Sequence, residues 1–314
     1  MKFFSGQVEE FRQVVPVTIN FTLDDVSPFL SRTAESVLLR FLGQTLADQL
    51  ASLVNANLDE QTDRVLIRAL KLTRLAVGNI GFAEYLPFGE VQIEDGAITV
   101  AASEGRKPAF QYQTDRLEEK LLQTGYQALD DLITLVAANS VLFPGWSEAP
   151  YKDEYDSSFF KSPVEFSKSY GIQDRWLTFW ALRPALRSVE ENYGEAAQAR
   201  IDALPNTVTD AQKAQLGRLL RRALAYQTIL EALPGLAIDI DGAKLKVNYG
   251  SQFGNTQYYQ APSRDDLNWL QQNLEKQTAL FWSTFESTLS AALPPVSETA
   301  TATGPQSEGS FFLL

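Results

Sequence analysis

The chain has 314 residues, 45% of them hydrophobic and 21% charged, a composition typical of a globular protein with room for two domains. It contains neither cysteine nor histidine, so disulfides, thiolate or imidazole metal sites and catalytic triads with a histidine base are excluded. Its formal net charge of −12 disfavours global attraction to nucleic acid or to an anionic membrane, so any contact with DNA would have to be local.

The first predicted element is a short strand within residues 11–21. Four apolar side chains alternate along it: Val15, Val17, Ile19 and Phe21. This two-residue period is typical of a strand with one buried face, and Pro16 confines the strand to a sheet edge. A helix is predicted next, over residues 22–43, with Pro28 in its first turn and Gly43 at its end.

Two further helices flank a predicted hairpin in the first half of the chain. The first covers residues 63–85 and ends before Pro87. The turn signal Asp95-Gly96 then predicts a small β-hairpin. Residues 115–136 give the clearest helix, with one apolar stripe: Leu117, Leu121, Ala128, Leu129, Leu132 and Val136. Four acidic residues lie off this stripe: Glu118, Glu119, Asp130 and Asp131.

The same order of elements recurs in the second half. Helices are predicted over residues 176–194, 211–233 and 264–293, and LPGLAIDIDGAKLKV at 233–247 repeats the hairpin signature of YLPFGEVQIEDGAITV at 85–100. Four pairs of landmarks keep nearly one spacing: Gly43 and Gly194 are 151 residues apart, Pro87 and Pro234 147, Gly96 and Gly242 146, and Leu117 and Leu267 150. This regularity favours a tandem repeat over coincidental helices in an all-helical protein.

The sequence therefore predicts a mainly α protein, a tandem repeat of one adaptor-like helical module in which each copy has a small β-hairpin. An extended C-terminal tail follows the second copy. The predicted parts are a first helical module at 1–146, a connecting segment at 147–172, a second helical module at 173–292 and a flexible tail at 293–314. The tail has the composition of a disordered linker.

No sequence feature supports catalysis. Phosphate-binding glycine loops and nucleophile elbows do not occur in the sequence. Asp153, Glu154 and Asp156 would hold a hard cation only loosely, and a solvated linker is the preferred interpretation. Asp239 and Asp241 favour a hairpin turn over a calcium loop, because the acidic closure of such a loop is missing. We expect neither enzymatic activity nor a cofactor or metal, with a carboxylate-dependent metal hydrolase as the least favoured alternative.

Basic residues at corresponding places in both modules form the candidate interface. The helix at 63–85 carries Arg64, Arg68, Lys71 and Arg74, and its counterpart carries Arg218, Arg221 and Arg222. The first four fall within about a third of the helix circumference. Both sets would meet an acidic surface of a neighbouring subunit, such as the four acidic residues of the 115–136 helix, or DNA in a channel. An ordinary solvated helix face is the alternative.

Apolar residues near both ends of the chain are predicted anchors. The tail closes with an apolar tip: Phe311, Phe312, Leu313 and Leu314. On a flexible tether this tip would dock into a groove or sheet edge of another subunit, or fold back onto its own core. Phe3 and Phe4 form a second candidate anchor. Six aromatic residues at helical spacing are expected in the core or between the repeats: Trp176, Trp180, Trp269, Phe281, Trp282 and Phe285.

Three stretches of the chain resemble a known family. They are VVPVTINFTLDDVSPFLSRTAE, RALKLTRLAVGNIGFAEYLPFGEVQIEDGAITV, and KPAFQYQTDRLEEKLLQTGYQALDDLITLVAAN followed by FPGW. Up to residue 146, and more weakly beyond it, the chain is similar to an uncharacterised family from tailed phages and prophages of Bacteroidota-type hosts, encoded among head and neck genes. The order of helix, Leu-Pro, hairpin and the motifs K-x-A-F-Q-Y-Q and G-Y-x-A-L-D-x-L carries the resemblance.

The helical module is also similar, in helix order alone, to the head–tail adaptor proteins of long-tailed phages, which form a ring beneath the portal. This resemblance implies a structural protein of the virion neck, assembled in the host cytoplasm as a homo-oligomeric ring, dodecameric by analogy with portal-bound adaptors. The implied partners are the portal protein, a stopper or tail-completion protein, and channel DNA contacted without sequence preference, with no membrane. The alternative is a protein-binding module of the tail or baseplate. The resemblance supplies no catalytic residues, and the doubled module departs from a simple adaptor.

Overall fold

The computed structural model describes residues 3–17, 21–89, 91–94, 97–100, 111–150, 152, 157–237 and 264–293, and the predicted mainly helical fold is confirmed. The first unit contains α1 (Val8–Arg12), α2 (Leu23–Thr33), η1 (Ala34–Leu39), α3 (Arg40–Ser52), η2 (Leu53–Asn55), α4 (Arg64–Gly89), β1 (Val91–Glu94), β2 (Ala97–Val100) and α5 (Gln111–Ala138). After η3 (Pro144–Glu148), the second unit contains α6 (Pro163–Ser167), α7 (Trp176–Val189), η4 (Glu190–Gly194), α8 (Glu195–Asp202), α9 (Asp210–Ala237) and α10 (Arg264–Ala292).

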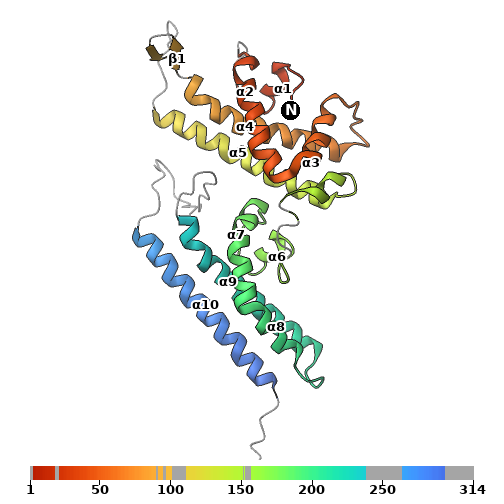
Figure 1. Ribbon diagram of the computed structural model, residues 1–314, viewed down its shortest axis with the longest axis vertical. Helices are drawn as coiled ribbons and strands as arrows, with labels where there is room; N and C mark the ends of the chain where they lie inside the picture. Colours follow the sequence, from red (N-terminus) through yellow and green to blue (C-terminus); the bar gives the residue numbers. More distant parts are fainter. Residues whose placement is uncertain are drawn as a thin grey trace, which may run out of the picture.

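The two units share one plan. In the first, α4 packs against α5 and α2; in the second, α9 packs against α10 and α7. Figure 1 shows the first unit above the second, each with a long pair of neighbouring helices. The described chain therefore contains two helical units with the same order of their main helices.

Buried residues recur at a fixed spacing along the long helices. On α4 and α9, three buried pairs lie 147 positions apart: Ala69 and Leu216, Ala76 and Ala223, Val77 and Leu224. On α5 and α10, three buried pairs lie 153 positions apart: Leu121 and Leu274, Leu132 and Phe285, Val136 and Leu289. The long helices thus bury corresponding faces, which is expected of repeated units that pack in the same way.

One helix in each unit, α2 and α7, contains a proline and is followed by a π-helical segment. Pro28 lies inside α2 and Pro184 inside α7, 156 positions apart. The π-helical segments η1 and η4 begin at Ala34 and Glu190, also 156 positions apart. Pro28 is therefore deeper in its helix than the predicted first turn. Because proline removes one backbone donor, a helix that contains it loses an i to i−4 hydrogen bond.

Close approach of the helices in the first unit depends on two glycines. A Cβ added at Gly81 of α4 would lie 2.8 Å from Leu30 Cδ2 and 3.2 Å from the Leu30 backbone of α2. A Cβ at Gly125 of α5 would lie 2.5 Å from Ile80 Cγ1 of α4. Real Cβ atoms do not approach so closely, so these contacts require the missing side chain.

The strand predicted within residues 11–21 is absent from the described part of that stretch. The N–H of Val15 donates to Phe11 O at 2.9 Å, and the N–H of Val17 donates to Val15 O at 2.9 Å. Pro16 has no N–H to donate. These local bonds use the donors that a strand would offer to a neighbour, so Val15 and Val17 lie in an irregular segment after α1 instead.

Gly43 and Gly194 were both predicted to end helices: Gly43 does interrupt a helix, at a kink that separates two helical segments, whereas Gly194 does not. Gly43 has φ 78° and ψ 169°, and the chain bends there and continues helical to Ser52. This positive φ suits glycine, and an added Cβ would also lie 3.0 Å from Pro150 Cδ. Gly194 is helical, with φ −68°, and an added Cβ there would lie 2.8 Å from the Phe159 ring. Gly194 is thus used for packing rather than for helix termination.

The region after α4 corrects one prediction and leaves another open. Pro87, predicted to follow the second helix, lies inside α4, which ends at Gly89. β1 and β2 pair antiparallel, with Val91 opposite Val100. The hairpin predicted for the second half falls on residues 238–263, which lie outside the described residues. A hairpin in each module therefore stays a prediction.

An aromatic cluster joins the two units. The ring centroid of Trp146 in η3 lies 6.2 Å from that of Trp176 and 6.4 Å from that of Trp180, both in α7. Phe41 of α3 stacks on Trp180 with centroids 5.9 Å apart and planes 10° apart. Packing of Trp176 and Trp180 between the repeats is therefore confirmed. Aromatic pairs in these arrangements contribute stabilisation beyond that of the apolar area they bury, so the cluster stabilises the contact between the two units.

Asp130 adds a polar contact to the same junction. Its Oδ1 accepts a hydrogen bond from Leu177 N at 2.9 Å in the first turn of α7, and Arg175 at the N-cap of α7 supplies no side-chain cap. Asp130 is only 5% exposed, which corrects the expectation that it belongs to an acidic surface that a neighbouring subunit could meet. Burial raises its pKa from 3.8 to about 6, against the lowering effects of the Leu177 N–H and the Arg175 charge. A carboxylate of the first unit thus caps a helix of the second.

The other predictions about apolar residues are partly confirmed and partly wrong. Phe285 is fully buried, as predicted, but Trp269 is 64% exposed and Leu117 is 41% exposed, contrary to prediction. Phe3 and Phe4, one of the predicted anchors, are buried in the core of their own unit. The N-terminal aromatic pair therefore packs within the chain.

Candidate anion-binding groove

α9 presents three of the predicted basic residues on its exposed face. Its buried face packs against α7 and α10 and includes Leu216, Leu220, Ala223 and Leu224. Arg218, Arg221 and Arg222 follow one another at spacings that bring them together on the opposite side of the helix, and all three are exposed. Because the buried residues fix the rotation of α9, the guanidinium groups are held toward solvent.

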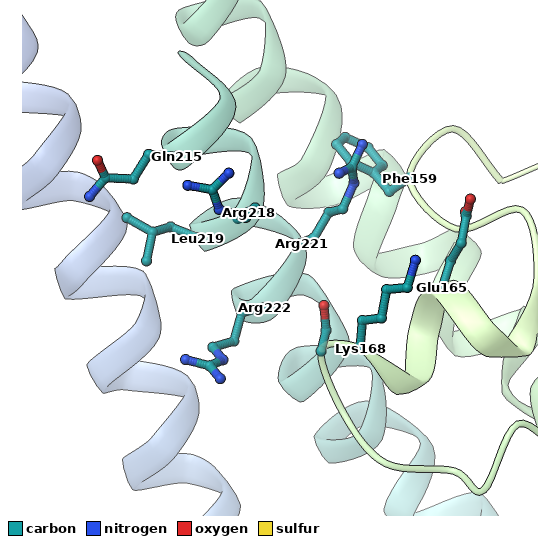
Figure 2. Close-up of a pocket in the computed structure, with 9 residues that line it drawn as sticks. Phe159, Glu165, Lys168, Gln215, Arg218, Leu219, Arg221 and Arg222 are labelled. Atoms are coloured by element: carbon teal, nitrogen blue, oxygen red, sulfur yellow. The ribbon is translucent and has the colours of Figure 1, made fainter. Parts of the chain in front are cut away.

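The three arginines line a groove of about 530 Å³. Six other residues complete its lining: Phe159, Glu165, Lys168, Ser169, Gln215 and Leu219. In Figure 2, Arg221 extends toward Phe159 and the α6 side chains, whereas Arg218 and Arg222 extend toward α10. Cations therefore lie on both sides of α9.

The wall opposite α9 is built around the short helix α6. Ser162 Oγ caps this helix by accepting a hydrogen bond from Glu165 N at 3.3 Å, and Glu165 Oε2 accepts one from Lys161 N at 2.7 Å. Pro163 at the first helical position suits a helix start. Lys168 follows as the C-terminal cap residue. The Glu165 carboxylate is thus already bound to the backbone.

The Phe159 corner of the groove is fixed by a buried carboxylate. The Ser157 hydroxyl donates to Glu190 Oε1, and Ser158 N donates to Glu190 Oε2 at 3.2 Å. The same hydroxyl accepts from Phe160 N at 2.8 Å. Phe159 itself is 8% exposed, so it offers little ring surface to the groove. Ser158 and Glu190 here serve to position a turn.

The cations of the groove have no counter-ion among the residues that the structure describes. Within the described ranges, no ion pair involves any of four residues: Lys168, Arg218, Arg221 and Arg222. Arg222 Cζ lies 5.1 Å from the Phe281 ring centroid, a cation–π contact that holds its side chain over α10. Lys168 and Arg221 therefore face the groove beside one carboxylate that the backbone already binds, and Arg218 and Arg222 line its α10 side. This excess of positive charge makes the groove a candidate site for an anion.

The first unit carries a related basic row on α4. Arg64, Arg68 and Lys71 are exposed, and Lys71 lies 147 positions before Arg218, the spacing that also relates the buried faces of α4 and α9. Arg64 Nε donates weakly to Glu60 O at 3.4 Å. Both units thus present exposed cations at a corresponding place.

Arg74 is different from the other candidate residues. Its Nε donates to Phe3 O at 2.9 Å, its Nη2 lies 2.8 Å from Glu10 Oε1, and its Cζ lies 5.9 Å from the Phe4 ring centroid. The side chain is 16% exposed. These contacts correct the expectation for Arg74, which holds the N-terminal segment against α4 and does not offer its charge to a partner.

Several predicted residues lie outside the described residues. They are the apolar tip Phe311, Phe312, Leu313 and Leu314, and the acidic residues Asp153, Glu154, Asp156, Asp239 and Asp241. Among the residues that the structure does describe, no group of three or more acidic residues is placed to hold a metal ion. None of the described helices is long and apolar enough to cross a membrane.

The sequence prediction missed Lys168, the cation on the α6 wall. The signal was present, because Ser162-Pro163 followed by Glu165 is typical of a helix start and places Lys168 at the end of a single short helix. Its proximity to α9 could not be predicted, because it depends on a contact between residues about fifty positions apart in the chain.

Comparison with known proteins places the chain in a family. The model of the Family of unknown function (DUF6712) matches residues 38–155 and 182–302, most of the chain, and the protein belongs to that family. The matched stretches begin 144 residues apart, so one falls on each of the two repeat-like regions. No curated protein and no solved structure matches the chain.

Proposed function

We propose that the protein is a structural component of a tailed-phage neck, a connector that assembles into a closed ring joining the portal to the tail. Its partners are other copies of itself, dodecameric by analogy with portal-bound adaptors, the portal protein, and a stopper or tail-completion protein. It is assembled in the host cytoplasm and resides in the virion neck. In this proposal each module is an adaptor-like repeat, and the protein works by fitting against neighbours, not by catalysis.

One observation carries the proposal: two helical units with the same plan are joined through a packed junction while large apolar side chains stay exposed. Trp269 and Leu280 on α10 are 64% and 55% exposed, and Val141 after α5 is 93% exposed. Burial of side chains of this size against a neighbouring protein would remove apolar area from water. The junction of Trp146, Trp180 and Asp130 supports a body that keeps its shape within an assembly.

Asp130 is the described group with the chemistry closest to that of a catalytic acid, because its pKa is raised to about 6 beside a cavity of about 260 Å³. Its Oδ1 is, however, committed to the N–H of Leu177. A helix cap accounts for both its burial and its contacts, so Asp130 does not favour an enzyme.

Mass photometry of the purified protein tests the proposal. We expect one discrete oligomer at a whole-number multiple of the 34.9 kDa chain. A chain that stays monomeric at every concentration would contradict the ring. The second candidate, a protein-binding module of the tail or baseplate, is favoured by the same exposed Trp269 and Leu280, and a stable monomer would support it.

A further inference from the structure

We propose that the groove between α6 and α9 binds the phosphate backbone of duplex DNA without reading its sequence. The inference deepens the connector function and rests on it for the identity of the polyanion, since DNA would pass through a neck ring. The site itself follows from the four cations of the lining, none of which forms an ion pair with a described residue. Arginine guanidinium groups match the geometry of phosphate oxygens, and a lysine adds a point charge to them.

The lining of the groove favours nucleic acid over an acidic protein as the ligand. Protein interfaces centre on buried aromatic or aliphatic anchors, with charges at the rim. Here the two apolar residues of the lining are Phe159, which is 8% exposed, and Leu219, which is half-buried. The groove therefore offers charge and hydrogen-bond donors without a pocket for an anchoring side chain.

The same lining favours a duplex over a single strand. Binding of single strands relies on exposed aromatic rings on which bases stack. Phe159 is buried, and the Phe281 ring is occupied by the guanidinium of Arg222 and by Tyr226, whose ring centroid is 4.6 Å away. Since neither of these described rings is free to stack on a base, phosphate contact is the mode that the groove supports.

A repeated placement of cations supports an extended ligand. Lys71 on α4 and Arg218 on α9 occupy corresponding positions, and Arg68 adds a second exposed charge to α4. A small anion would need only one of these groups of cations, whereas an extended polyanion with regularly spaced charges can contact the cations of both units. Because the chain has a net charge of −12, we expect the binding to be weak and confined to low ionic strength.

Salt-dependent binding of a fluorescent DNA duplex of mixed sequence tests the proposal. The logarithm of the affinity should fall linearly with the logarithm of the salt concentration, by about 0.9 per phosphate contacted. Replacing two cations, Arg218→Gln with Arg221→Gln, should lower this slope by about 2 and leave the thermal unfolding unchanged, because both residues are exposed. The pair Arg218→Lys and Arg221→Lys should restore the slope.

A matched control separates the groove from overall charge. Arg187→Gln with Arg200→Gln changes the net charge equally in the same unit, but these arginines pair with Glu191 at 2.8 Å and Glu286 at 2.6 Å. We expect this control to leave the slope unchanged. An equal loss of slope in the control would overturn the proposal, because it would show a general charge effect.

Two other results would also overturn the inference, and they distinguish its failure from that of the connector function. A wild-type protein that forms rings but does not bind the duplex at low salt would remove the inference and leave the connector. Loss of self-association in the Arg218/Arg221 glutamine variant, with duplex binding unchanged, would identify an acidic protein surface as the ligand. Rings together with the predicted change in slope would support both proposals.

Discussion

Arg74 and Arg221 occupy corresponding positions, 147 residues apart on α4 and α9, yet the two units use them differently. In the first unit, the N-terminal segment covers α4, and Arg74 binds Phe3 O and Glu10. In the second unit, the same helix face is open, and Arg221 lines the groove. Corresponding arginines on corresponding helices can therefore either form an internal contact or remain exposed, depending on which segment packs beside the helix.

The largest expected loss of stability comes from disrupting the aromatic junction that packs the two units together. Trp180→Ala should lower the free energy of unfolding by about 3–5 kcal/mol, because it removes a buried side chain that packs on Phe41 and Trp146. Urea denaturation followed by circular dichroism measures this loss. Trp269→Ala, at a residue that is 64% exposed, should change it by less than about 0.5 kcal/mol. Equal losses in both variants would refute the junction as described.

The comparison of the two arginines is sharpened by a matched pair of substitutions. Arg74→Ala should destabilise the protein by about 2 kcal/mol, because it leaves Phe3 O and Glu10 without their hydrogen-bond donor. Arg221→Ala should leave the stability nearly unchanged, because its side chain is exposed and makes no ion pair with a described residue. Chemical denaturation of both variants provides the measurement. If Arg221→Ala were the more harmful, the assignment of the two roles would be reversed.

Asp130 should give the junction a dependence on pH. Its pKa is about 6 in the folded state and near 3.8 when unfolded, so the folded state holds a proton that the unfolded state has lost between these values. The stabilisation from this group is present below about pH 4 and lost as the pH rises through 6. Arg175 and Asp131 are the charged neighbours that act on it.

Asp130→Asn keeps an acceptor for Leu177 N but removes the titration. The wild type loses stability as the pH rises from about 4 to 7, whereas the variant does not. We therefore expect the free energy of unfolding of the variant to rise by roughly 1–2 kcal/mol relative to that of the wild type over this range, as measured by urea denaturation at several pH values. Asp130→Ala, which removes the cap, should be less stable than Asp130→Asn at every pH. If the difference in unfolding free energy between Asp130→Asn and the wild type did not vary with pH, the raised pKa of Asp130 would be contradicted.

Helices and the repeat were accessible to sequence reasoning because their signals are local and periodic. The stripe of Leu121, Leu132 and Val136 predicted α5 from a period near 3.6, and the repeated Leu-Pro and Asp-Gly-Ala signals predicted two related halves. One family model matches a stretch in each half of the chain, and these stretches coincide with the two repeat-like regions.

Two of the errors, at Asp130 and Arg74, share one physical cause, a partner distant in the sequence. Asp130 was expected on an acidic surface because its partner, the N–H of Leu177, lies 47 residues further on. Arg74 looked exposed because Phe3 and Glu10, which lie more than sixty residues earlier, approach it only in the folded chain. Periodicity fixes a helix face but does not state which element will cover that face.

The central claim is that two corresponding helical units, joined as one body, assemble with copies of the same chain into a closed ring. Averaged electron micrographs of the purified protein test it most directly. The account predicts closed rings with a central opening and two stacked densities per subunit. Open chains, or separate two-lobed particles that never close, would contradict it.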